Sequence, residues 1–535
     1  MKKNICSFRC SYCICSIILS VFLTIGNKIT FSGSVSASYT LNYFEAFHFT
    51  DLIYFLFWNL AIYFILVIMN LTINKYGSIM FTANTNISLN VHCWAFYSCA
   101  LILLWLPWLL TLAPGSVLTD SLSSIHQSLG APLNNQHPIL YTAFVSIFIH
   151  IGIALDNINI GIFLYTICQY TAMALSLGYV LAWLYKHNIK SLIIIVVLLY
   201  YAFTPYFPSY AVIMWKDPLF STFLLLYSLL FINIAEANTT YRSRQGIIAY
   251  FLLSLGIMFF RNNGIFIVLA CGIVLFLCFG KRLKVYYICW ASAMLIYALV
   301  TGPVYKYLDV KKPAMEAMGI PLQQIAYIVT HSGIIDSDHE QFIYQLLPKE
   351  EFLTNYAPCL VDPLKWNASF NVEFLENNAK DFLSVWLQLF PSNISSYIKS
   401  YCLGTYGFWY PGIQNNYGYI DTYIADNNLG IYRHDIVEQL TGYSLYSLIE
   451  KLKLYIGSGS LAWFMLVSLT LVVSSRNKRY IAFYCPGLFC WGSVLLATPV
   501  AFSLRYVYIL PMALPLFIFV PFIIAHSPQT HSVFN

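Results

Sequence analysis

Uncharged apolar runs recur along most of the chain and are separated by short polar loops. The runs are roughly 17 to 25 residues long, which is the length of a helix that spans a bilayer. The pattern therefore predicts an all-α polytopic membrane protein with about twelve transmembrane helices. We place these helices at residues 8–26, 51–71, 93–113, 160–185, 191–207, 217–235, 247–260, 264–280, 285–304, 459–475, 480–498 and 505–525.

The long segment 305–458 interrupts this series of apolar runs. It contains mixed charges, Pro, Gly, Asn and aromatic residues, and it is long enough to fold as a domain. We expect a mixed α domain outside the membrane, inserted before the last three helices. The chain then divides into N-terminal helices (1–92), a transmembrane module (93–304) whose first outer loop is 114–159, this domain (305–458) and C-terminal helices (459–535).

One further apolar run, Ile139–Leu155, could cross the membrane or lie at its surface. If it does not cross, every basic cluster between spans falls on the side of the N-terminus, which the positive-inside rule makes cytoplasmic. These clusters are Lys2/Lys3/Arg9, Lys75, Lys186/Lys190, Arg242/Arg244, Lys281/Arg282/Lys284 and Arg476/Lys478/Arg479. We therefore expect the run to lie at the outer interface or to re-enter, both termini to be cytoplasmic and residues 305–458 to be extracytoplasmic.

The composition supports lipid as the solvent for most of the chain. Hydrophobic residues make up 59% and charged residues 9%, with a mean hydropathy of +0.68, whereas a soluble domain carries about 25% charged residues. The formal charge of +6 is spread over the loops, so we expect no nucleic-acid partner.

The segment Met1–Ile25 has the features of a signal peptide or of a first transmembrane helix, and we favour an uncleaved helix. Cys359 and Cys402 could form a disulfide, but the sequence does not give their distance.

Ionisable and amide residues gather at the predicted outer ends of the spans. Charge near hydrocarbon is costly and is usually kept for a functional site. The residues concerned are Asp120, Asn135, His137, Lys216, Asp217, Arg261, Asn262 and Arg505. These residues are the candidate site.

Each candidate has a structural alternative beside its functional one. Asp120 could act as a general base, or it could be an acid in the first turn of a helix. The cations Lys216, Arg261 and Arg505 could bind a phosphate, or they could anchor the chain at the interface. His137 could contact a substrate or a metal, although a single histidine is more often structural.

Asp217 most simply pairs with its neighbour Lys216 or caps the helix that begins after Pro218. Its functional alternative is to hold that lysine or a sugar hydroxyl in place.

The strings that hold these residues support a family resemblance. They are Pro114-Gly-Ser-x-x-x-Asp-Ser, Asn135-x-His-Pro, Lys216-Asp and Arg261-Asn-Asn-Gly. With the layout of an early outer loop and a large late outer domain, they resemble the GT-C superfamily of membrane glycosyltransferases. That superfamily includes protein O-mannosyltransferases and the lipid A aminoarabinose transferase, and the strings are most similar to those of a bacterial GT-C-like branch of unknown function.

The resemblance implies that Asp120 is the catalytic base and that the donor is a polyprenyl-phosphate sugar. The chain departs from the family in one respect, because many members have paired acids in the first loop and Asp120 is followed by Ser121. We predict no metal ligands, but this departure leaves a divalent cation open as a cofactor.

We expect an inverting glycosyltransferase that works at the outer face of the cell membrane. It would transfer a sugar from a polyprenyl-phosphate carrier, a membrane lipid, to a cell-envelope glycan or lipid. One alternative is a transporter or flippase of lipid-linked sugars, which predicts paired broken helices in two related halves. Another is a non-catalytic envelope assembly or sensor protein, in which Asp120 would be dispensable.

Overall fold

The computed structural model describes residues 9–33, 41–82, 91–237, 243–412, 420–452, 454, 456–475, 477–497 and 500–526. These residues are almost entirely helical. The sheet in the described part is a two-residue antiparallel pair, β1 (Ile29–Thr30) with β2 (Tyr43–Phe44). The predicted all-α class is confirmed.

Seven helical stretches of the described residues are long and apolar enough to cross a membrane. They are Phe49–Met80, which is α2 (Phe49–Tyr76) with η1 (Gly77–Met80); α3 (Val91–Thr111); α6 (Ile158–Lys186); α9 (Lys216–Glu236); Gly264–Tyr307; Lys478–Ala497, which is η6 (Lys478–Tyr480) with α24 (Ile481–Ala497); and α25 (Ile509–His526). These helices are consistent with a multi-pass membrane protein.

Other apolar helices are shorter or bent. α7 (Ser191–Phe203) and α8 (Tyr206–Val212) together are long enough to span, but they meet at an angle of 51°. The short apolar helices are α1 (Cys10–Gly26), α5 (Ile139–Ala154), α10 (Arg244–Phe260) and α23 (Ser458–Val473). Their lengths of 10–17 residues fall below or at the lower limit for a span.

The stretch Gly264–Tyr307 reverses direction near its middle. α11 (Gly264–Phe279) ends at Gly280, whose φ of 55° lies in the left-handed region that favours glycine, and η2 (Gly280–Leu283) leads to α12 (Lys284–Leu299). The Trp290 indole of α12 donates a hydrogen bond of 3.0 Å to the Val268 carbonyl of α11. The predicted spans 264–280 and 285–304 are thus two helices that fold back on each other.

The exposure of apolar side chains also fits a membrane. The side chains of Phe49, Phe57 and Ile68 in α2 are 76%, 63% and 60% exposed, and the helix has almost no charged residues beside them. Such a continuous apolar surface is unstable in water and is normal in lipid. In contrast, α9 lies at the centre, where it contacts α6, α10, α24 and α25.

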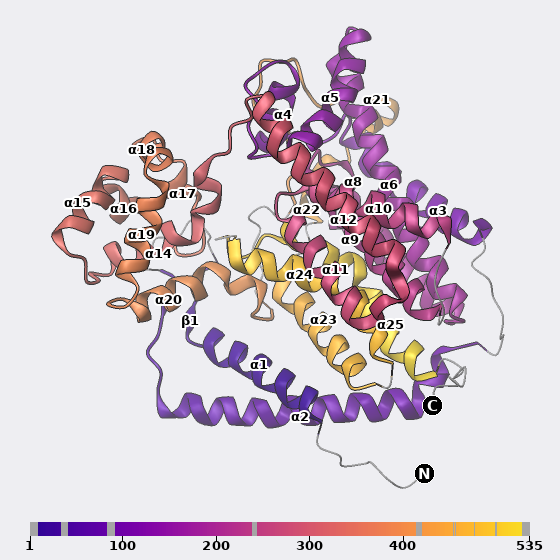
Figure 1. Cartoon of the computed structure of the whole chain (residues 1–535). Helices are drawn as coiled ribbons and strands as arrows, with labels where there is room; N and C mark the ends of the chain where they lie inside the picture. The colour runs from indigo at the N-terminus through magenta and orange to yellow at the C-terminus, as the bar shows by residue number, and fades with distance from the viewer. Residues whose placement is uncertain are drawn as a thin grey trace.

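Seven helices form a lobe beside the long helices, on the left of Figure 1. They are α14 (Gly319–Thr330), α15 (Ser337–Leu346), α16 (Lys349–Asn355), α17 (Asp362–Lys365), α18 (Val372–Asn377), α19 (Ala379–Leu389) and α20 (Ile394–Thr405). The chain reaches this lobe through η3 (Val300–Val304), α13 (Tyr305–Tyr307) and η4 (Ala314–Ala317), and η5 (Tyr406–Phe408) follows it. Cys359 and Cys402 are free buried thiols in the lobe, so no disulfide joins them.

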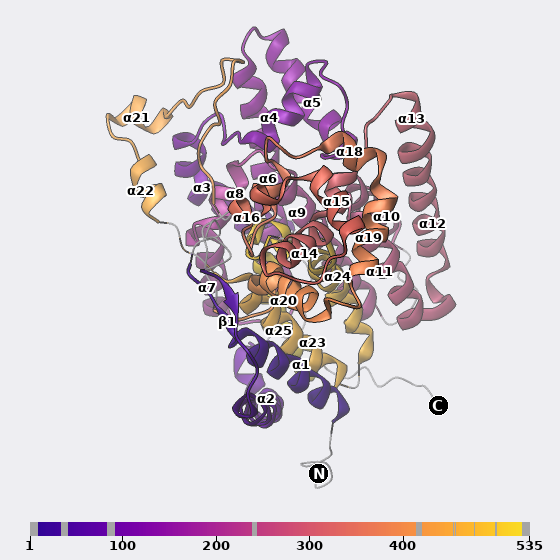
Figure 2. The ribbon, with the colours of Figure 1, turned by 90° about the vertical axis from the view of Figure 1, so that its left-hand side faces the viewer.

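Residues 420–435, which we call the strap, lie away from the lobe. The Ala425 amide donates to the Val117 carbonyl at 2.8 Å, and the His434 amide donates to the Ala113 carbonyl at 2.7 Å. The strap therefore lies on the segment between α3 and α4. It leads to α21 (Ile436–Thr441) and α22 (Tyr446–Lys451), which Figure 2 shows well apart from α15 to α20.

The loops that were predicted to be cytoplasmic meet at one end of the long helices. The Lys190 amide donates to the Met80 carbonyl at 3.0 Å, and Lys186 pairs with Glu236 at 3.1 Å. Both α9 and α11 contact η6 at this end. The charge pattern of the sequence predicts that these basic loops lie together. Four of the basic residues named above, Lys2, Lys3, Arg242 and Arg476, lie outside the described residues.

Helix α5 does not reach that basic end. Its Tyr141 hydroxyl lies 3.1 Å from the Tyr165 hydroxyl of α6, and Gly152 packs directly on Gly161. α5 therefore runs antiparallel beside the first part of α6 only. Together with α4 (Thr119–Ser128) it lies at the top of Figure 1.

We predict that Gly161→Ala destabilises the α5–α6 pair. A Cβ atom at Gly161 would overlap the backbone oxygen of Phe148, and backbone cannot rotate away as a side chain can. Overpacking of this kind typically costs about 1 to 3 kcal/mol. The thermal midpoint in detergent should fall, whereas Gly302→Ala, where a Cβ would meet nothing within 4 Å, should leave it unchanged. Equal midpoints for the two variants would contradict the close packing of α5 on α6.

Candidate functional site

The segment between α3 and α4 and the segment before α9 are joined by backbone hydrogen bonds. The Ser116 amide donates to the Val212 carbonyl at 3.0 Å, and the Met214 amide donates to the Ser116 carbonyl at 2.9 Å. The Ser121 hydroxyl adds a bond of 2.6 Å to the Met214 carbonyl. These bonds place the start of α4 next to the start of α9, so Asp120 and Lys216 belong to one site.

Asp120 is held by Arg505, which lies 385 positions further along the chain. The Arg505 Nη1 donates to the Asp120 Oδ2 at 3.1 Å, and its Nη2 donates to the Tyr506 hydroxyl at 3.0 Å. The guanidinium carbon lies 4.8 Å from the ring centre of Trp215. A third of the Asp120 side chain is exposed, so a ligand can reach the carboxylate.

His137 is the partner of Lys216. The Lys216 Nζ donates to the His137 Nδ1 at 2.7 Å, and His137 is only 4% exposed. Burial and then the positive charge of Lys216 lower the pKa of His137 to about 3. The imidazole is therefore neutral at physiological pH, with Nδ1 as acceptor and the proton on Nε2.

Asp217 pairs with Arg261 and not with its neighbour Lys216, which corrects the simplest expectation from the sequence. The Arg261 Nη1 lies 3.1 Å from the Asp217 Oδ1, and the two side chains are 11% and 2% exposed. Arg261 also donates to the Tyr506 carbonyl at 3.3 Å, and its guanidinium lies 4.7 Å from the Tyr506 ring centre. Arg261 is thus engaged by protein groups on several sides.

Asn262 and Asn135 shape the loop behind these ion pairs. The Asn262 Nδ2 donates to the Asn135 carbonyl at 2.8 Å, and the Asn135 amide donates to the Lys311 carbonyl at 2.8 Å. The Asn135 Oδ1 is buried and has no hydrogen-bond partner among the described residues. The structure therefore brings all eight predicted residues to one end of the long helices.

The site has more positive than negative charge. Its cations are Lys216, Arg261 and Arg505, and its carboxylates are Asp120 and Asp217. Burial alone would raise the pKa of the Asp120 carboxyl, but the positive charges of Arg505 and Lys216 outweigh burial and hold that pKa well below its usual range. With both carboxylates ionised, one positive charge is unmatched, which favours an anionic ligand.

The described ranges contain no group of three His, Cys, Asp or Glu side chains that could hold a metal ion. Asp120 is instead surrounded by cations. A ligand with its own negative charge fits this surrounding.

Several residues of the site were not predicted. Tyr506 contacts both Arg261 and Arg505, and Trp215 lies under Arg505. Both are chain neighbours of predicted cations, and that adjacency was a usable signal. Lys365 of the lobe also contributes to the low pKa of His137, and nothing in the sequence connects these two residues.

The fold and site define a class of multi-pass membrane protein with a buried, net positive cluster at one end of its helices. A family model described as a family of unknown function (DUF6020) matches residues 125–532, and the chain belongs to this family. The match includes His137, Lys216, Arg261 and Arg505 and begins five positions after Asp120. No curated protein and no solved structure matches the chain.

We predict that His137→Asn makes stability less dependent on pH. Between about pH 3 and pH 6.5 the unfolded chain binds a proton at His137 that the folded protein does not bind, so stability falls as pH drops below about 6.5. At pH 5 this amounts to about 2 kcal/mol. Asparagine keeps an acceptor for Lys216 but does not titrate.

Thermal midpoints in detergent at pH 5 and pH 7 measure this effect. The difference between the two midpoints should be smaller for His137→Asn than for the wild type. His126→Asn, at an exposed histidine of α4, should keep the wild-type difference. A wild-type difference in His137→Asn would mean that the buried imidazole is not kept neutral.

Proposed function

We propose that this protein is a GT-C-type inverting glycosyltransferase that uses a polyprenyl-phosphate sugar. One observation carries the proposal, namely that a partly exposed carboxylate, Asp120, lies among the cations Arg505 and Lys216. A transferase of this kind needs a base for the acceptor hydroxyl and positive charge for the departing phosphate. The site offers both at one end of the apolar helices.

The proposed reaction is a direct displacement at the anomeric carbon. The acceptor oxygen forms a bond to that carbon from the face opposite the phosphate, and the bond from carbon to the phosphate oxygen breaks. The acceptor proton goes to Asp120, while the electron pair leaves with the polyprenyl phosphate. Lys216 and Arg505 stabilise the negative charge that develops on the phosphate, and the configuration is inverted.

Arg505 has two successive partners in this proposal. In the structure it binds Asp120, and that contact makes the carboxylate a weak base. A donor phosphate competes for the same guanidinium, because a phosphate accepts charge-assisted hydrogen bonds from arginine. Donor binding would thus free Asp120 for the acceptor.

The assignment of Arg261 differs from that of Lys216. Arg261 keeps its ion pair with the almost fully buried Asp217 and so positions the start of α9. Lys216, whose one hydrogen-bond partner in the described structure is the neutral His137, is free to meet a phosphate. The phosphate site then consists of Lys216 and Arg505, with Arg261 and Asp217 behind it.

The proposal includes a topology. About twelve helices cross the membrane, the basic end faces the cytoplasm with both termini, and residues 305–458 form an inserted domain on the outer face. There Asp120 would meet a cell-envelope glycan or lipid. The grouping of Lys186, Glu236 and η6 at the opposite end supports this orientation.

Asp120→Asn tests the function. The amide keeps the size of the carboxylate and an acceptor for Arg505, but it does not take up the acceptor proton. Loss of a general base typically lowers the rate about a hundred- to ten-thousandfold. We expect a folded protein with that loss, measured as sugar transfer from a polyprenyl-phosphate donor in detergent.

Asp309→Asn is the matched control, since Asp309 is exposed and its left-handed φ of 50° suits asparagine. It should keep full turnover. If Asp120→Asn also transfers sugar at the wild-type rate, Asp120 has no catalytic role. If the wild type transfers nothing, the transporter alternative becomes the better account.

Lys216→Met and Arg261→Gln should fail in different ways. Lys216→Met keeps the apolar stem, so the protein should stay folded while donor use falls roughly ten- to a hundredfold, the scale of a charge-assisted hydrogen bond. Arg261→Gln leaves the buried Asp217 unpaired, which typically costs about 3 to 5 kcal/mol. Thermal stability should therefore fall in Arg261→Gln and recover when Asp217→Asn is added. A double variant that is as unstable as Arg261→Gln alone would contradict the ion pair.

A further inference from the structure

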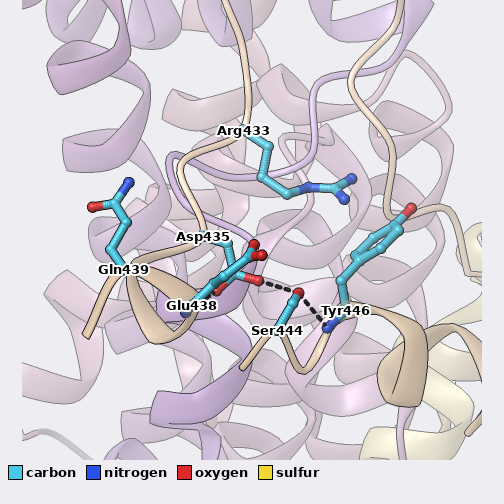
Figure 3. Close-up of a pocket in the computed structure, with 6 residues that line it drawn as sticks. All are labelled: Arg433, Asp435, Glu438, Gln439, Ser444 and Tyr446. Atoms are coloured by element: carbon cyan, nitrogen blue, oxygen red, sulfur yellow. Dashed lines mark hydrogen bonds between the residues drawn. The ribbon is translucent and has the colours of Figure 1, made fainter. Parts of the chain in front are cut away.

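A hollow of about 410 Å³ lies where the end of the strap meets α21 and α22. Its lining consists of Arg433, Asp435, Glu438, Gln439, Ser444 and Tyr446, which Figure 3 shows as sticks. The volume falls within the usual range for small-molecule sites, roughly 300 to 1,000 Å³. Neither Asp120 nor Lys216 lines this hollow, so the hollow is distinct from the proposed catalytic site.

Two of the lining residues hold the wall in place. The Asp435 Oδ1 accepts from the Glu438 amide at 2.9 Å, and its Oδ2 accepts from the Ser444 hydroxyl at 2.5 Å. The Arg433 guanidinium lies 3.6 Å from the ring centre of Tyr446. Figure 3 shows the two side chains next to each other. Arg433 and Asp435 are therefore structural parts of the hollow.

Glu438 and Gln439 are different, because both side chains are exposed and neither makes a hydrogen bond within the described structure. In Figure 3 Glu438 points into the group beside Asp435, and Gln439 borders the group on the opposite side from Tyr446. The lining as a whole offers carboxylates, a carboxamide, a hydroxyl, a phenol and one guanidinium. Such a set both donates to and accepts from the hydroxyl groups of a polyol.

The charge of the lining narrows the ligand class. Two carboxylates face one guanidinium, so the hollow is net negative if all three are ionised. Anionic sugars such as uronic acids or sugar phosphates would be repelled, and each of the six lining side chains carries a polar group. A neutral saccharide fits the lining.

The strap connects this hollow to the catalytic carboxylate. The Arg433 Nη2 donates to the Thr422 carbonyl at 2.8 Å, and the next residue, Tyr423, lies within the field of Asp120, which helps to raise the pKa of the tyrosine after burial and Asp421. Ile424 pairs with Val117, three positions before Asp120. The hollow and Asp120 are therefore linked through the strap.

We propose that the hollow between the strap and α21–α22 is a subsite for the acceptor, and that the acceptor is a neutral oligosaccharide. The proposal rests on the glycosyltransferase function and specifies its acceptor. Glu438 and Gln439 bind sugar hydroxyls there. The hydroxyl to be glycosylated belongs to a residue further along the saccharide, at Asp120.

Binding of defined saccharides to the full-length protein in detergent tests this. The probes are three neutral trisaccharides, maltotriose, cellotriose and tri-N-acetylchitotriose, with trigalacturonate as an anionic counterpart. Dissociation constants come from NMR titration. At least one neutral trisaccharide should bind, and trigalacturonate should bind at least tenfold more weakly. Glu438→Gln and Gln439→Ala should each weaken the neutral probe by about tenfold, the usual scale for losing a hydrogen bond in a binding site.

Glu376→Gln, at an exposed glutamate of α18, is the matched control and should bind as the wild type does. The proposal is overturned if no neutral trisaccharide binds, if trigalacturonate binds as tightly, or if Glu438→Gln binds like the control. Failure of the acceptor subsite is thus separable from failure of the transferase, which is measured by transfer and not by binding.

Discussion

The pairing of charges beside hydrocarbon is the constraint on which the arrangement of this protein depends. A charge that leaves water costs several kcal/mol unless another charge or several hydrogen bonds meet it. Arg505 meets Asp120, Arg261 meets Asp217, and Lys216 meets the neutral His137. These contacts join α4, α9, the turn before α11 and η7 (Leu504–Val507), so the ends of helices far apart in the sequence are fixed together.

The sequence allowed the candidate site to be predicted as a set of residues but not as a set of pairs. Charges at the ends of apolar runs are conspicuous, so Asp120, Lys216 and Arg505 could be selected. Which cation faces which carboxylate depends on the crossing of helices, and local spacing favoured Lys216 as the partner of Asp217. In the structure Asp217 forms its ion pair with Arg261, which lies 44 positions away in the sequence.

The helices themselves were largely predictable, because lipid requires long apolar segments with few charges. The short and broken helices were less so. α7 and α8 meet at 51°, and α10 and α23 have only 17 and 16 residues, so their boundaries are not set by the length of an apolar run alone. The position of the strap could not be predicted, since it contacts Val117 and Ala113 through backbone hydrogen bonds, which do not depend on particular side chains.

The excess of positive charge argues that the cluster serves more than stability. Well-packed apolar residues of similar volume can replace a buried ion pair with little loss, so pairing alone is weak evidence for function. An unmatched cation is harder to explain structurally, because the described structure gives Lys216 a hydrogen bond to the neutral His137 but no ion pair. A bound anion would offset it, and a phosphate diester carries the single negative charge that Lys216, Arg261 and Arg505 leave unmatched by Asp120 and Asp217. This balance supports a phosphate-linked donor over a neutral one.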